Sequence, residues 1–148
     1  MSIEILAFTP ADYDAALALW QRAEGIGLSE ADSRPNIELY LQRNPGMSFV
    51  ARSEGRLVGA VLCGHDGRRG YLHHLAVDPS VRRLGLGRRL AEAALAALKD
   101  AGIHKCHLFL FNRNEAGLSF WSALGWERRG DLCIVSKEIS ANGTKCPC

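Results

Sequence analysis

The residues with the most distinctive chemistry lie in a short loop, residues 82–87, and at the start of the helix predicted after it. The loop reads Arg82-Arg83-Leu84-Gly85-Leu86-Gly87 and is followed by Arg88 and Arg89. Glycine lets a backbone approach a ligand closely, and the free N–H groups of a helix's first turn attract anions. The arginines add positive charge, so this stretch predicts a site for a diphosphate or a similar anion. A solvated arginine-rich surface is the alternative interpretation.

Two common phosphate-binding motifs do not match this loop. The dinucleotide-binding fingerprint places G-x-G-x-x-G directly after a strand, and the P-loop has the pattern G-x-x-x-x-G-K-[ST]. Here the glycines follow an arginine-bearing loop, and no Lys-Ser or Lys-Thr pair comes after them. The spacing therefore excludes both motifs.

A strand and a helix must hold this loop in place. Residues 71–77 carry apolar side chains on both faces and end at Asp78-Pro79, a pair that favours a turn, which indicates a buried central strand. After the loop, apolar residues recur at every fourth position before a glycine, which predicts an amphipathic helix. These residues are Leu86, Leu90, Ala94 and Leu98, with Gly102 just past the end. The anion site is therefore expected on a strand, a loop and a helix.

The loop resembles the R-x-x-G-x-G acetyl-CoA loop of the GNAT superfamily of N-acetyltransferases, with Arg82, Gly85 and Gly87 in the defining places. Residues 114–126 resemble a later motif of that family: an asparagine, a short helix, an aromatic pair, and then a glycine followed by an aromatic. The two motifs occur in the family's order. The resemblance covers roughly residues 3–139.

The resemblance implies an α/β fold with a mixed, mostly antiparallel sheet of about seven strands, a central strand that splays from its neighbour, and about four helices. The alternation of the chain agrees with this fold, and we expect one domain over residues 1–139 followed by a mobile tail, 140–148. The strands are expected at residues 3–8, 47–52, 57–63, 71–77, 105–111, 126–127 and 132–139.

The resemblance also implies acetyl-CoA as the acyl donor. The loop and helix start would bind its pyrophosphate through Arg82, Arg83, Leu84, Gly85, Leu86, Gly87 and Arg88. Leu75 and Val77 would offer backbone groups to the pantetheine arm. Asn114 and Trp121 of the later motif would also bind CoA.

The implied reaction is direct transfer of the acetyl group, in a ternary complex, to a small amine, an amino-acid derivative or a protein amine. The amine must be neutral to react, and histidine suits the role of base near neutral pH. Strand alternation puts Tyr71 and His73 on one face and His74 on the other. The strand is similar to that of the arylalkylamine N-acetyltransferases. In those enzymes, the positions that match Tyr71 and His73 both hold active-site histidines. We expect His73 to be the base, His74 to replace it if the register differs, and Tyr71 to donate a proton.

Trp121 departs from the family's pattern. Many members carry a tyrosine there that protonates the departing thiolate, and an indole N–H is far too weak an acid for this step. Tyr71 or water would then supply the proton, or the thiolate would leave unprotonated, since a thiol has a pKa of about 8.5. A catalytically inactive acyl-CoA-binding sensor or interaction module is the alternative function.

Two early helices are expected from residue 10 to near 25 and from 35 to 44. In this family, the two helices and the loop between them would form one wall of the acceptor site. Four residues of this wall could meet an acceptor: Trp20, Glu24, Asp32 and Tyr40. Core, cap or surface roles are the alternatives for each.

Composition and charge argue against other classes of protein. The 148 residues are 47% hydrophobic and 23% charged, as in an ordinary soluble domain, and a net charge of +2 argues against a nucleic-acid partner. No transmembrane run or secretory signal is present, so we expect a cytoplasmic protein without a membrane partner. Five cysteines do not suggest a disulfide framework, and Cys146 with Cys148 are too few ligands for a metal site. A homodimer is expected from the family's habit.

Overall fold

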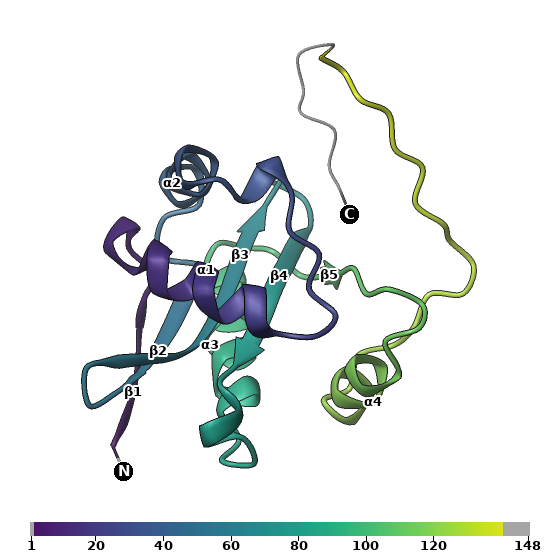
Figure 1. The fold of residues 1–148 in the computed structure, drawn as a ribbon. Coiled ribbons are helices and arrows are strands. Elements are labelled where there is room, and N and C mark those ends of the chain that lie inside the picture. Colours follow the sequence, from purple (N-terminus) through teal and green to yellow (C-terminus); the bar gives the residue numbers. More distant parts are fainter. Residues whose placement is uncertain (1, 141–148) are drawn as a thin grey trace.

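A single mixed sheet forms the centre of the computed structural model, which describes residues 2–140 (Figure 1). Its strands are β1 (Ile3–Ala7), β2 (Phe49–Ser53), β3 (Arg56–His65), β4 (Gly70–Val77) and β5 (Cys106–Leu108). They lie side by side in chain order; β1 to β4 pair antiparallel, and β5 runs parallel to β4. The expected mixed, mostly antiparallel sheet is therefore confirmed.

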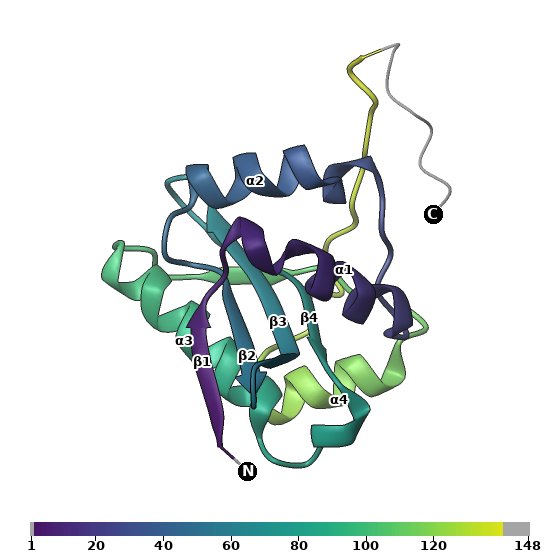
Figure 2. The same cartoon turned by 60° about the vertical axis from the view of Figure 1, so that its left-hand side comes forward.

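Four α-helices cover the two faces of this sheet, as expected (Figure 2). They are α1 (Tyr13–Arg22), α2 (Arg34–Arg43), α3 (Leu86–Asp100) and α4 (Glu115–Ala123), with short 3-10 helices at Pro10–Asp12, Glu30–Asp32 and Pro79–Val81. The buried side chains of α1 and α2 pack on one face, and those of α3 and α4 pack on the other. The strand β3 is buried on both faces over residues 57–63, so the core lies in three layers.

The predicted periodicity of α3 is confirmed by its burial. Leu86, Leu90, Ala94 and Leu98 are each no more than 2% exposed and face the sheet. The helix follows Gly85, whose φ of 72° is in the left-handed region that glycine adopts without strain. The loop is thus held between the end of β4 and the start of a well-anchored helix.

The strand β4 has an irregularity at its middle. Ala60 of β3 pairs with Ala76 of β4, and Leu62 pairs with His73. Two residues along β3 therefore correspond to three along β4, so β4 contains one extra residue. His74, in this bulge, has a φ of 56°. Beyond Leu72, β4 no longer pairs with β5, which confirms the splayed central strand.

The predicted strand count of seven is wrong, because the described part of the chain contains five strands. Residues 126–127 and 132–139 form no strand; the stretch 126–140 runs away from the sheet as an extended trace (Figure 1). A strand requires a paired neighbour, and this segment lies beside none, although it has strand-like alternation. Several of its apolar side chains beyond Trp126 are exposed: Leu132 is 63%, Ile134 67%, Val135 89% and Ile139 100% accessible.

The strand expected at residues 105–111 is shortened to Cys106–Leu108 for the same reason, since only these residues pair with β4. Phe109 and Phe111, just beyond it, are largely exposed. No helix in the described range is both long and apolar enough to cross a membrane. The tail residues 141–148, with Cys146 and Cys148, lie outside the described residues.

Candidate functional site

The bulge in β4 brings two successive histidines to the same side of the sheet. A regular strand would direct His73 and His74 to opposite faces. Instead, their ring centroids lie 6.3 Å apart, with His73 next to Tyr40 of α2 and His74 next to Trp20 of α1. The expectation of opposite faces is therefore wrong, because the extra residue and the positive φ of His74 break the alternation.

His74 is fully engaged by its neighbours. Its Nε2 lies 2.8 Å from Oδ1 of Asp32, and its backbone carbonyl accepts a hydrogen bond of 2.8 Å from Trp20 Nε1. The second oxygen of Asp32 accepts the backbone N–H of Ser29 at 3.1 Å. These bonds join the α1–α2 connection to the bulge, which indicates a positioning role for His74.

His73, in contrast, is half-buried and forms no side-chain hydrogen bond with the described residues. The rings of Tyr40, Tyr71 and Phe109 surround it at centroid distances of 6.2–6.5 Å. Burial lowers the pKa of His73, the neighbouring His74 lowers it further, and Asp32 partly opposes the change. A neutral imidazole is favoured at pH 7, so His73 is available to take up a proton.

A cavity of about 230 Å³ opens beside His73. Its lining comes from the end of α2, the end of β3 and the start of β4: Tyr40, Arg43, Asn44, Gly64, His65, Asp66, Tyr71 and His73. The two predicted catalytic residues, Tyr71 and His73, thus line the same space. Of the four residues proposed for the acceptor wall, Tyr40 lines it, Asp32 bonds His74, and Trp20 is 0% exposed in the core. Glu24 is on the surface.

The predicted anion loop lies at the other end of β4. Arg82, Arg83 and Leu84 are exposed, and neither arginine side chain forms a hydrogen bond or ion pair with another described residue. Arg83 has a φ of 68° and Gly85 one of 72°, so the loop turns sharply into α3. The N–H groups of the first turn of α3 lack carbonyl partners within the helix, which favours an anion there.

Two further arginines near this loop have protein partners. The Nε of Arg88 donates to Glu92 Oε1 at 2.8 Å, and Arg89 donates to the carbonyl of Ile3 at 3.4 Å. Asp78 closes the preceding turn by accepting the N–H of Ser80 at 2.9 Å. Arg82 and Arg83 are therefore the cations of this region that are free for a ligand among the described residues.

Gly87 has a packing role that the sequence did not indicate. A Cβ at Gly87 would lie 3.0 Å from Cζ of Phe120 and 3.8 Å from Cδ2 of Leu75. The missing side chain therefore makes room for α4 against α3, at the place where β4 has separated from β5. Phe120, which the motif analysis did not single out as a binding residue, is partly exposed there.

The two residues of the later motif have structural contacts of their own. Trp121 is 7% exposed and packs edge-to-face on Phe120 and Trp126, each at 5.0 Å. Asn114 caps α4, because its Oδ1 accepts the N–H of Gly117 at 2.9 Å. The Asn114 amide also lies against Gly25 of the α1–α2 connection. These contacts account for both side chains without a ligand.

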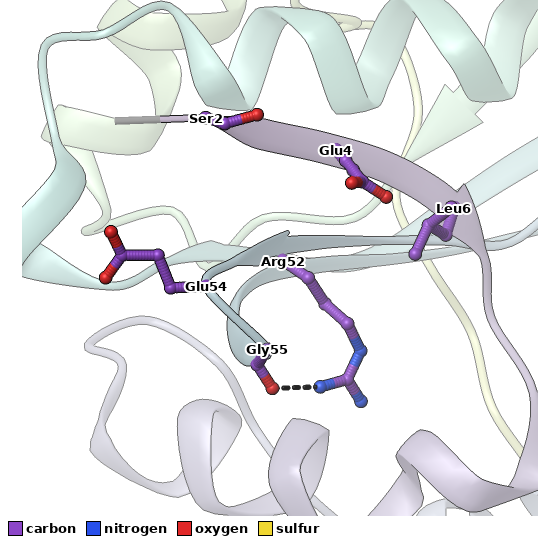
Figure 3. Close-up of a pocket in the computed structure, with 6 residues that line it drawn as sticks. All are labelled: Ser2, Glu4, Leu6, Arg52, Glu54 and Gly55. Carbon is purple, nitrogen blue, oxygen red and sulfur yellow. Dashed lines mark hydrogen bonds between the residues drawn. The ribbon is translucent and has the colours of Figure 1, made fainter.

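A larger hollow of about 380 Å³ lies at the opposite edge of the sheet, over β1 and the β2–β3 hairpin (Figure 3). Its cation, Arg52, donates to the carbonyl of Gly55 at 2.9 Å and pairs with Asp12. Because Arg52 is already satisfied and the hollow is remote from β4, we do not place chemistry there.

Comparison with known proteins identifies the family of this chain. The model of the acetyltransferase (GNAT) family matches residues 13–126. The chain belongs to the GNAT family of acetyltransferases. The expected family and enzyme class are thereby confirmed, and acetyl-CoA is the acyl donor of this GNAT protein.

Curated relatives of this GNAT protein cover nearly its whole length. An acetyltransferase of Pectobacterium atrosepticum is 31% identical over 84% of this chain and 88% of its own. One of Sodalis glossinidius is 28% identical over 93% of this chain and 96% of its own.

Solved structures of other proteins share the fold of this GNAT protein. An N-acetyltransferase (PaiA) of Thermoplasma acidophilum in complex with coenzyme A has a TM-score of 0.72, with 21% identity over 84% of this chain and 89% of that one. AAC(6')-Iy in complex with a bisubstrate analogue has a TM-score of 0.74, with 18% identity over 94% of this chain and 100% of that one.

Proposed function

We propose that this protein moves the acetyl group of acetyl-CoA directly to the amine of a small molecule or peptide, in a ternary complex, with His73 as the base. One observation carries the proposal. A histidine that is favoured in its neutral form and has no described protein partner lines a cavity on β4, near the point where β4 leaves β5.

The residues of the loop fit the anionic end of CoA. Arg82 and Arg83 are exposed and without described partners, and the α3 N-terminus adds unpaired N–H groups. We assign the pyrophosphate to Arg82, Arg83, Leu84, Gly85, Leu86, Gly87 and Arg88, and the pantetheine arm to the backbone of Leu75 and Val77. Asn114 and Trp121 remain proposed CoA residues, acting through the position of α4 that their packing maintains. When bound, acetyl-CoA supplies a thioester carbonyl that a neutral amine can attack.

The proton balance of the reaction assigns the remaining roles. His73 takes one proton from the acceptor ammonium, which frees the nitrogen lone pair. The nitrogen then forms a bond to the acetyl carbon, and the carbon–sulfur bond breaks. The second proton of the nitrogen passes to water, from which Tyr71 regains the proton that it gives to the thiolate. Tyr71, in the same cavity, is proposed to pass a proton to the departing thiolate, which is also stable enough to leave as an anion near neutral pH.

The test combines calorimetric titration with acetyl-CoA and an assay of thiol release with a broad panel of amines. His73→Ala should lower kcat/KM at least about 100-fold, as expected for loss of a general base, and leave the acetyl-CoA affinity unchanged. His104→Ala, which changes an exposed histidine near the start of β5, is the matched control. Full activity of His73→Ala would remove His73 from the base role.

Trp121, which stands where many members of the family carry a tyrosine, favours a second function, that of an acyl-CoA-binding sensor without catalysis. Tight binding of acetyl-CoA without thiol release on any amine would support the sensor. The variant Trp121→Tyr distinguishes the transferase from the sensor. If the wild type is inactive and the variant turns over, the wild type lacked only the acid that protonates the thiolate. If the wild type already turns over, the same variant should be no faster and less stable, since a smaller ring leaves a gap in the core.

We further propose a homodimeric, cytoplasmic protein with one domain over residues 1–139. The support for a dimer is the exposed apolar segment 132–139, together with the outer edge of β5, on which no other described strand lies. An unpaired strand edge is a template for another extended segment. Light scattering and cell fractionation test the two statements separately.

A further inference from the structure

The cavity beside His73 contains three polar groups without protein partners. The hydroxyls of Tyr40 and Tyr71 and the imidazole of His73 all belong to lining residues, and none forms a side-chain hydrogen bond with another described residue. Burial raises the pKa of Tyr40, so its hydroxyl remains protonated and able to donate. No fully buried side-chain N or O atom of the described residues lacks a partner, so these three polar groups reach the open space of the cavity, where a ligand can contact them.

The floor of the cavity is made by a rigid set of contacts. A Cβ at Gly64 would lie 2.6 Å from the Tyr40 hydroxyl and 2.6 Å from Asn44 Nδ2, so a side chain there would displace both. Asn44 is 4% exposed; its Oδ1 accepts the N–H of His65 at 3.1 Å and its Nδ2 donates to the carbonyl of Tyr40 at 3.3 Å. The end of α2 is thereby fixed to the end of β3, and the cavity has a defined depth.

The mouth of the cavity carries an excess of positive charge. Arg43 lines it, is exposed, and forms no ion pair with a described residue. Asp66 also lines it, but its Oδ1 accepts the N–H groups of Arg68 and Arg69, both at 2.8 Å, and these bonds lower its pKa. The Arg68 cation also lowers the pKa of Asp66, so it offsets this carboxylate and leaves Arg43 as the lining cation without a described partner. An anionic group is therefore favoured at the mouth, and a second cation is disfavoured.

Resting on the proposed function, we infer that the acceptor is a small amino acid-like molecule, with its amine next to His73 and a carboxylate next to Arg43. The aromatic rings of Tyr40 and Tyr71 suit an apolar body between the two groups. A volume of about 230 Å³ accommodates a molecule of this size. Arg43 binds the carboxylate by a charge-assisted hydrogen bond, which makes it a specificity residue.

The experiment compares two pairs of acceptors that differ by the carboxylate alone: phenylalanine with 2-phenylethylamine, and leucine with 3-methylbutylamine. The wild type should favour each amino acid in kcat/KM. Arg43→Gln should raise KM for the amino acids about tenfold, the loss expected for one charge-assisted hydrogen bond, and leave KM for the amines unchanged. Arg128→Gln, which alters an exposed arginine on the C-terminal segment, is the matched control.

A binding measurement makes the inference independent of turnover. In the presence of CoA, adding phenylalanine should shift the NMR resonances of the His73 imidazole, and Arg43→Gln should weaken this titration about tenfold. Preference for the decarboxylated amines, with no effect of Arg43→Gln, would overturn the inference and leave the transferase intact. Acetyl-CoA binding without acetylation of any acceptor in the broad panel, and without an imidazole shift, would overturn both.

Discussion

His73 and His74 are neighbours in sequence with different environments. One is hydrogen-bonded to a buried carboxylate, and the other has no side-chain partner in the described chain and lines a cavity. The choice of His73 as base came from a resemblance of the strand, and its access to the cavity supports that choice. The pairing of His74 with Asp32 was not predictable, because the two residues are far apart in sequence and meet only through the bulge.

The lowered pKa of His73 predicts how both activity and stability depend on pH. A base must be deprotonated, so kcat/KM should rise through an acid limb with an apparent pKa below about 6.5, the ordinary value for histidine. At His73 the folded state binds fewer protons than the unfolded state, so the free energy of unfolding rises with pH. The contribution of His73 to stability is therefore complete above about pH 6.5 and is lost as pH falls through its lowered folded-state pKa. His73→Gln should remove the acid limb and flatten the thermal stability profile between pH 5 and 7. An unchanged limb would point to another base.

Asp32→Asn tests the positioning role of His74. Asp32 is 8% exposed and bonds both the imidazole and the N–H of Ser29, so the change should destabilise the fold by about 1–3 kcal/mol. Loss of the bulge geometry should also lower kcat while the affinity for acetyl-CoA stays within a factor of two or so. Chemical denaturation and steady-state kinetics measure the two effects. Asp14→Asn, an exposed partner of Arg34, should change neither quantity.

At the level of elements, the helices and the first four strands followed from periodicity, from helix caps and from turn residues. The bulge in β4 did not, because a histidine at positive φ is uncommon and carries no local signal. Arg82 and Gly85 were proposed as CoA-binding residues from their motif, and this role stays a prediction. Gly64 and Arg43 were not predicted as site residues. The cavity that they line is formed by two strands and a helix, and its lining residues do not follow a recognisable motif in the sequence.

Arg82→Ala should weaken acetyl-CoA binding about tenfold, because an exposed guanidinium without a described protein partner is lost from the start of α3. The loss should shrink as salt is raised, since a solvated ion pair is screened. Calorimetry at two ionic strengths measures both. Arg128→Ala provides the comparison, because it removes an exposed arginine from the C-terminal segment. Equal affinities for the wild type and Arg82→Ala would exclude a pyrophosphate at this loop.

The whole molecule differs from expectation at its C-terminal end. The strand expected at residues 132–139 is absent, because an apolar sequence alone does not supply a neighbouring strand with which to pair. The exposed side chains of Ile134 and Val135 are unfavourable for an isolated chain in water, and β5 has a free outer edge within the described structure.

If a second copy covers this segment, light scattering should give twice the monomer mass. Val135→Lys together with Ile139→Lys should then shift the protein to the monomer, because burying two ammonium groups in an apolar contact is costly. Leu39→Lys, which alters an exposed leucine on α2, should leave the mass unchanged. A wild-type protein that stays monomeric at high concentration would contradict the proposed dimer.

Trp20 is fully buried, donates to the carbonyl of His74, and holds its ring 5.2 Å from the His74 imidazole. The other two tryptophans, Trp121 and Trp126, pack against each other on the opposite face of the sheet. The emission of an indole depends on its surroundings, so Trp20 should act as a built-in optical reporter of the bulge. Its fluorescence would follow any change in the contact between His74 and Asp32, without any added label.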